Sequence, residues 1–220
     1  MRMSLPAKAW QHVLGAITIG LIACGLLSCS QSPVRLHAAK HEYDPRDYQD
    51  IIERWTRRYE VYEAFVGKAF FTATYRSLEM RRAGLAWYQN IYQLPPNEME
   101  PRRVREENED SQYYEFFVAV STHQREWNNL AEAATPWRIA IINQRNEELV
   151  ATAVTKEDQK SAELRSIYPY IDEYVLTYTI RFPKIPPGRT TEFVTAEPGV
   201  MTLKFSGPAG IASLTWQLLD

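Results

Sequence analysis

Three histidines downstream of the first 30 residues are the first candidates for chemistry, because imidazole serves as a metal ligand and as a general base. His37 and His41 have the i, i+4 spacing of two ligands on one helical face, but the nearby acids are only Glu42 and Asp44. The surrounding composition is that of a flexible tether, which is a poor metal site. We therefore expect no metal site, and we interpret His123 as an ordinary loop histidine.

Nucleophilic catalysis has little support in this sequence. Ser121, Thr122 and His123 are adjacent, and adjacent side chains on an extended segment point to opposite faces, so they do not form a triad. The G-x-S-x-G pattern of a nucleophile elbow is absent. We therefore expect no catalytic residues of this type.

Carboxylates offer a second hydrolytic possibility, because glycosidases need two acids at a controlled separation. The acids that we consider are Asp172, Glu173, Glu192 and Glu197. Sequence alone does not set their distances, and acids in such segments are usually solvated loop residues. A carboxylate-based hydrolase remains the least favoured of three functional hypotheses.

The densest aromatic group in the second half of the chain is a candidate ligand-binding surface. Tyr168, Tyr170 and Tyr174 lie within seven residues, and Pro169 separates the first two. Exposed rings of this kind bind sugars or peptides. The alternative, which we favour, is that Tyr168 and Tyr174 pack into the core.

The N-terminus has the layout of a secretory signal. Arg2 and Lys8 precede an apolar run over residues 13–27, and no acid occurs before that run ends. The run has about 15 residues, whereas a membrane-spanning helix needs about 20, so an uncleaved transmembrane helix is the weaker interpretation.

The end of the apolar run, Leu26-Leu27-Ser28-Cys29, resembles the lipobox of bacterial lipoprotein precursors. This resemblance implies that residues 1–28 are removed as a signal peptide and that Cys29 becomes the acylated N-terminus of the mature chain. A second match ends at Cys24 and stays open as the alternative. We prefer Cys29, because apolar residues continue after Cys24 whereas a polar segment begins after Cys29.

The predicted anchor has consequences for location and chemistry. In lipoproteins of this kind, a serine such as Ser30 after the modified cysteine implies the bacterial outer membrane, with the domain facing either the periplasm or the cell surface. No cysteine follows Cys29, so disulfides, thiolate metal sites and cysteine nucleophiles are excluded from the mature chain. Removing the signal takes away two bases and no acid. The formal charge then moves from −2 to −4, which gives no reason to expect nucleic acid as a partner.

The first half of the mature chain predicts a lipidated tether over residues 29–43 and a mainly helical region over 44–111. Spacings of three and four residues predict a first helix that starts at Asp44 and carries the apolar side chains Tyr48, Ile52, Trp55, Tyr59 and Tyr62. A strand is predicted over 69–75, and Ser77 is expected to cap a second helix. Prolines after residue 93 and the charged stretch at 102–110 predict an exposed loop.

The second half, residues 112–220, predicts strands separated by polar turns. The predicted strands are 113–121, 137–143, 147–154, 173–182, 199–207 and 211–219. Hairpin turns are expected at 143–148 and at 206–210. This pattern favours an α+β protein with an immunoglobulin-like antiparallel β-sandwich and an N-terminal helical region.

These observations favour a non-enzymatic, outer-membrane lipoprotein that acts as a protein-binding adaptor or assembly factor in the cell envelope, without a cofactor. A glycan- or peptidoglycan-binding module is the alternative from another class. The expected partners are thus the membrane, through the lipid anchor, and an envelope protein, with a glycan as the alternative ligand.

Overall fold

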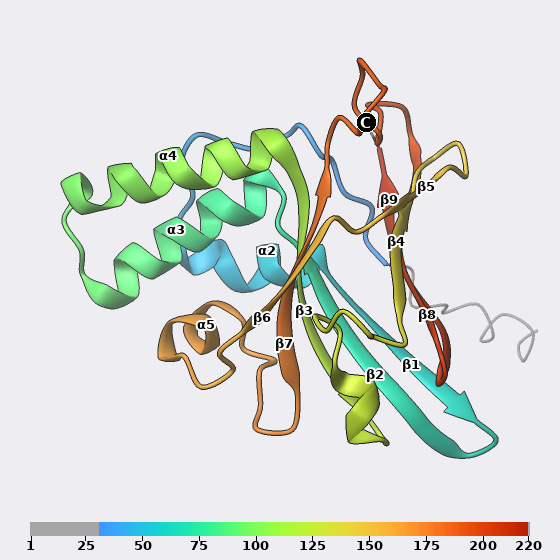
Figure 1. The fold of residues 1–220 in the computed structure, drawn as a ribbon. Helices are drawn as coiled ribbons and strands as arrows, with labels where there is room; N and C mark the ends of the chain where they lie inside the picture. Colours follow the sequence, from blue (N-terminus) through green and yellow to red (C-terminus); the bar gives the residue numbers. More distant parts are fainter. Residues whose placement is uncertain (1–30, 220) are drawn as a thin grey trace, which may run out of the picture. The chain divides into compact units, whose positions relative to one another are not determined.

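The computed structural model describes residues 31–219 (Figure 1). The predicted signal peptide and both candidate lipidation residues, Cys24 and Cys29, lie outside the described residues. Within the described part of the chain, no helix is both long enough and apolar enough to cross a membrane.

Two antiparallel sheets form the framework of the domain. The larger sheet has the strand order β1-β2-β3-β7-β6, and the smaller sheet has the order β5-β4-β8-β9. The larger sheet contains β1 (Thr56–Glu63), β2 (Val66–Tyr75), β3 (Tyr113–Thr122), β7 (Leu176–Pro183) and β6 (Ala153–Glu157). The smaller sheet contains β5 (Glu148–Val150), β4 (Arg138–Ile142), β8 (Gly199–Gly207) and β9 (Gly210–Leu218).

Helices cover the face of the larger sheet that the smaller sheet leaves open (Figure 1). They are α2 (Tyr48–Trp55), α3 (Leu78–Tyr92), α4 (Pro96–Gln112) and α5 (Ala162–Ile167), with the 3₁₀ turn η2 (Pro45–Asp47). A second 3₁₀ turn, η3 (Arg125–Asn128), follows β3, and its Trp127 carbonyl accepts a hydrogen bond from the Trp137 indole. Phe71 of β2 stacks on Phe205 of β8 between the sheets, at 4.5 Å between ring centroids. On the helical face, Phe117 of β3 stacks on Tyr168. Strand β3 is therefore buried on both faces, which explains the apolar run from Phe116 to Val120.

The predicted α+β class is confirmed by this arrangement of helices and antiparallel sheets. The immunoglobulin-like type of sandwich stays a prediction. The two predicted hairpins are present: Asn146 adopts a positive φ between β4 and β5, and Gly207 pairs with Gly210 between β8 and β9.

The first predicted helix is wrong in its second half. Helix α2 ends at Trp55, and Tyr59 and Tyr62 belong to strand β1, which pairs with β2 from Thr56 to Glu63. The spacing of these tyrosines suits a helix, but pairing with β2 overrides this local preference. The strand predicted at 69–75 is confirmed as part of β2.

The second predicted helix is confirmed, whereas the loop predicted after it is wrong. The Ser77 hydroxyl accepts a hydrogen bond from the Met80 amide and caps α3. The charged stretch forms α4, a helix of 17 residues that begins with Pro96. Proline is tolerated at the first helical position, and ion pairs to other elements satisfy the charges of the helix.

The strand predicted at 147–154 is two strands in different sheets. The Ala151 amide donates to Ile139 of the smaller sheet, and the next amide, of Thr152, donates to Arg181 of the larger sheet. The chain therefore passes from one sheet to the other between two consecutive residues. A continuous β-rich sequence does not reveal such a change of partner.

The predicted tether is shorter than expected. Val34 is buried, its amide donates to the Gln217 carbonyl at 2.8 Å, and its carbonyl accepts from the Leu219 amide at 2.9 Å. The chain is therefore attached to the end of β9 from Val34 onward. It then continues to the helical layer, where the Lys40 carbonyl accepts a hydrogen bond from Arg82 of α3.

Candidate functional site

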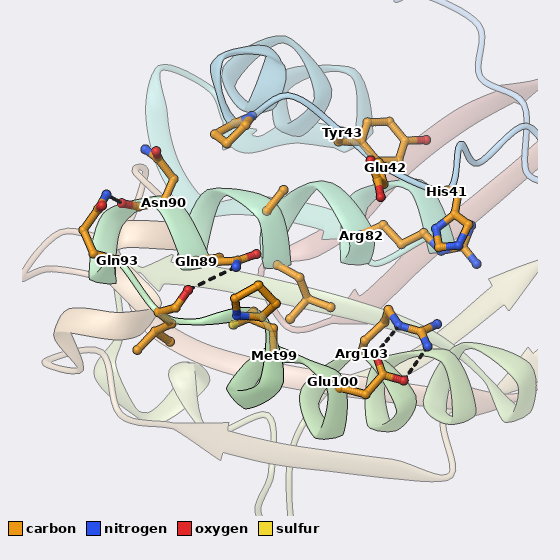
Figure 2. Close-up of a pocket in the computed structure, with 15 residues that line it drawn as sticks. His41, Glu42, Tyr43, Arg82, Gln89, Asn90, Gln93, Met99, Glu100 and Arg103 are labelled. Carbon is orange, nitrogen blue, oxygen red and sulfur yellow. Dashed lines mark hydrogen bonds and ion pairs between the residues drawn. The ribbon is translucent and has the colours of Figure 1, made fainter.

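A groove with a volume of about 670 Å³ lies between α3, the start of α4 and the segment 41–45 (Figure 2). This volume lies within the usual range of ligand-binding pockets. Residues from three parts of the chain line it: His41, Glu42, Tyr43 and Pro45; Arg82, Leu85, Ala86, Gln89, Asn90 and Gln93; and Leu94, Pro96, Met99, Glu100 and Arg103.

The apolar part of this groove is largely aliphatic. Leu85 and Ala86 of α3 are half-buried, and Met99 of α4 is buried beside them. The small side chain of Ala86 leaves space above this part of α3. The flexible thioether side chain of Met99 can pack against ligand groups of different shape. The aromatic rings in the lining are those of Tyr43 and His41, at the edge formed by the N-terminal segment.

One charged side of the groove is held in a fixed arrangement by Glu107 of α4. Its carboxylate bridges Arg82 of α3, at 2.9 Å, and Arg103, at 3.0 Å. Arg103 also pairs with Glu100 at 2.6 Å. Partial burial alone would raise the pKa of Glu107, but hydrogen bonds from Arg82 and Arg103 outweigh it and lower this pKa. The Arg103 hydrogen bond also lowers the pKa of Glu100. Both carboxylates are therefore ionised at neutral pH, which does not suit a general acid.

Amide side chains line the opposite end of the groove, where α3 ends. Gln89 Nε2 donates to the Leu94 carbonyl at 3.1 Å, and Gln93 Nε2 donates to the Asn90 carbonyl at 2.5 Å. These bonds orient the amides and leave their side-chain oxygens available to a ligand. With the carboxylate of Glu42 and the imidazole of His41, the groove offers both donors and acceptors around an apolar centre (Figure 2).

The helices that form the groove are joined to the larger sheet by a buried ion-pair network. Glu115 of β3 contacts Arg76, at 2.5 Å, Arg81 of α3, at 3.1 Å, and Arg181 of β7. Glu106 of α4 contacts both Arg76 and Arg81, at 2.6 and 2.5 Å. Each buried charge therefore has partners on another element, which a charge buried in a protein requires.

The three tyrosines proposed from sequence do not form one exposed surface. Tyr168 is buried and stacks on Phe117 with ring centroids 3.8 Å apart. Tyr170 is half-buried, and its hydroxyl is hydrogen-bonded to the Thr74 hydroxyl at 2.7 Å. Tyr174 is 75% exposed and stands apart in the loop before β7. The packing alternative thus holds for Tyr168 but not for Tyr174.

The four candidate carboxylates separate into two pairs at opposite ends of β7. Asp172 and Glu173 precede this strand, and Asp172 accepts hydrogen bonds from the amides of Tyr174 and Val175. Glu192 and Glu197 follow the strand, whose eight residues span roughly 26 Å. No acid of the first pair can therefore cooperate with one of the second pair as a glycosidase requires.

The histidines are not arranged as metal ligands. His37 and His41 lie in a segment without helical structure, and His123 is exposed after β3. Among residues 31–219, no group of three or more His, Cys, Asp or Glu side chains is placed to hold a metal ion.

Sequence reasoning missed the groove, because its residues come from segments that were interpreted as tether, helix and loop. The only available signal was the aliphatic and amide side chains along one side of the second predicted helix. No family model, curated protein or solved structure matches this chain.

Proposed function

We propose that this chain is a lipid-anchored protein of the bacterial outer membrane that binds a partner protein of the envelope through the α3–α4 groove. Acylation of Cys29 supplies the anchor, and Cys24 is the alternative modified residue. The sandwich, for which we retain an immunoglobulin-like type as part of this proposal, carries the helices that form the groove.

The observation that supports protein binding is the combination of an aliphatic centre with an amide and charged rim. Leu85 and Met99 suit an aliphatic side chain, and burying one fully contributes about 1.5–3 kcal/mol. The oxygens of Gln89 and Gln93 suit the amide groups of an extended peptide backbone. The groove thus matches a peptide segment that presents one aliphatic side chain.

Glycan or peptidoglycan binding remains the second candidate from sequence, and the groove supports it less. A sugar ring packs best on a flat aromatic face, whereas the centre of this groove is aliphatic. Tyr168 is unavailable for such stacking, because its ring already lies against Phe117.

In-cell photocrosslinking followed by mass spectrometry tests the anchored, protein-binding function. The wild-type chain is compared with Cys29→Ala, and Cys24→Ala serves as the matched control. We expect recurrent crosslinks to one envelope protein in the wild type and in Cys24→Ala, and loss of both membrane attachment and these crosslinks in Cys29→Ala.

Membrane attachment that persists in Cys29→Ala and fails in Cys24→Ala would move the anchor to Cys24. Normal attachment without any recurrent protein crosslink would contradict the protein-binding part of the proposal.

A further inference from the structure

The turn between β1 and β2 carries a group of exposed aromatic and apolar side chains. This hairpin-tip patch consists of Tyr59, Tyr62, Phe65, Val66 and Phe70. Phe65 has a relative exposure of 101%, and the others range from 38% to 56%. Single exposed apolar residues are ordinary, but five within one hairpin are a concentration of the kind that marks interaction sites, with Tyr62 and Phe70 on one face and Tyr59 on the other.

Contacts within the hairpin restrain part of the patch. The Tyr62 and Phe70 rings meet edge to face, with centroids 6.3 Å apart. Lys68 pairs with Glu63 at 2.9 Å. At Gly67, a Cβ atom would lie 2.4 Å from the Phe70 ring, so glycine allows this ring to approach the backbone closely. A preorganised surface loses little conformational entropy when a partner binds.

A concave region of about 450 Å³ adjoins the patch at the neighbouring β8–β9 turn. Tyr59 and Tyr62 line it together with Trp127 and Ile211. A recess of this shape suits a protruding side chain, whereas a planar bilayer surface would leave it unfilled. The hairpin residues 59–70 also contain two acids, Glu60 and Glu63, and only one base, which disfavours an anionic lipid surface.

The patch lies at the end of β9 opposite to the attachment of the N-terminal segment. Gly210, at the start of β9, lies beside Val61, whereas Val34 is bound at the other end of this strand, beside Leu218. The nine residues of β9 span roughly 30 Å. Only four residues lie between Cys29 and Val34, so the five Cα–Cα steps that join them reach at most about 18 Å. An anchor at Cys29 therefore holds the Val34 end close to the bilayer, and the patch lies at the far end of the strand.

We infer that the hairpin-tip patch is a second docking surface, separate from the α3–α4 groove, for a protein that presents an apolar side chain beside a lysine or arginine. The apolar side chain enters the recess next to Tyr59. The basic group pairs with Glu60, because Glu63 is already paired with Lys68. The orientation relative to the membrane rests on the proposed anchor at Cys29, whereas the docking surface does not depend on the groove. Two separate surfaces would allow the chain to bridge two proteins, as an adaptor does.

The test places a photoreactive phenylalanine analogue at position 65 of the full-length chain in living cells. Four backgrounds are compared: otherwise wild type, the Tyr59→Ala/Tyr62→Ala pair, the charge reversal Glu60→Arg, and Tyr174→Ala as a matched control on another exposed tyrosine. We expect one protein adduct in the otherwise wild-type and Tyr174→Ala backgrounds, reduced at least tenfold in the other two. Adding Ala86→Trp, which fills the groove, leaves this adduct unchanged if the two surfaces are independent.

Four outcomes would overturn the inference: adducts with lipid alone, adducts between two copies of the chain, a protein adduct insensitive to Glu60→Arg and the tyrosine pair, or no adduct. Because the groove is tested separately, failure at position 65 is distinguishable from failure of the proposed function.

Discussion

Glu115 of β3 and Arg81 of α3 form an ion pair of 3.1 Å in which neither side chain has any exposed surface. The pair joins the central strand of the larger sheet to the helix that forms one side of the groove. Arg76 and Arg181 complete the surroundings of Glu115. The position of α3, and therefore the shape of the groove, depends on this buried contact.

Replacing Glu115 by glutamine should destabilise the domain strongly. The substitution keeps the shape but removes the charge that compensates three guanidinium groups, and breaking a buried pair costs about 3–5 kcal/mol. The free energy of unfolding from urea titration measures the effect. Glu148→Gln, in the exposed pair with Arg138, is the matched control and should cost less than about 1 kcal/mol. Equal losses in the two variants would contradict the structural role of the network.

The stability of the domain should fall with acid through the same network. Burial alone would raise the pKa of Glu115, but Arg76, Arg81 and Arg181 outweigh it, and the pKa is lowered from 4.5. The pKa of Glu106 is lowered in the same way by Arg76 and Arg81. A carboxylate with a lowered folded-state pKa stabilises the protein above its unfolded-state value, and this contribution is lost as the pH falls through the folded-state value.

We therefore expect the contribution of these two carboxylates to be constant from pH 7 to about pH 5.5 and to decline below about pH 4.5. Urea titrations between pH 7 and pH 3 provide the measurement, with Glu115→Gln as the comparison. The decline should be shallower in the variant. An identical pH dependence of wild type and variant would show that Glu115 is not responsible.

Tyr168 and Tyr174 should respond in opposite ways to replacement by alanine. Tyr168 is buried against Phe117, so Tyr168→Ala should cost about 3 kcal/mol of unfolding free energy. Tyr174 is largely exposed, and Tyr174→Ala should change the stability by less than about 0.5 kcal/mol. Thermal or urea unfolding of both variants distinguishes them. Loss of glycan retention in Tyr174→Ala at unchanged stability would instead favour the glycan-binding alternative.

The attachment of Val34 to β9 predicts slow hydrogen exchange at two amides. The Val34 amide donates to the Gln217 carbonyl, and the Leu219 amide donates to the Val34 carbonyl. Both amides should therefore be protected from exchange in the wild type. Val34→Asp buries an unpaired charge and should release the segment, so that protection at Leu219 is lost. Val150→Asp, at an exposed position of β5, should leave it unchanged. Fast exchange at Leu219 in the wild type would contradict the attachment of Val34 to the end of β9.

The sequence predicts those parts of the fold that depend on local patterns. Alternation along β7 and turn residues at Asn146 and Gly210 are local signals, and so is the cap at Ser77; the corresponding elements are present. Helix α4 escaped prediction, because its charges are satisfied by residues such as Arg76 and Arg81, which are distant in sequence. The groove could not be predicted for the same reason, because the segment 41–45 lies beside α3 only after folding.

The most direct test of the proposed function is photocrosslinking from position 93 at the rim of the groove, in the anchored chain in living cells. Ala86→Trp fills the groove, and Ile91→Trp adds the same ring at an exposed position of α3 that does not line it. The proposed function predicts one recurrent envelope-protein adduct in the wild type and in Ile91→Trp, reduced at least tenfold in Ala86→Trp. An adduct of equal yield in all three chains, or no protein adduct at this position, would contradict it.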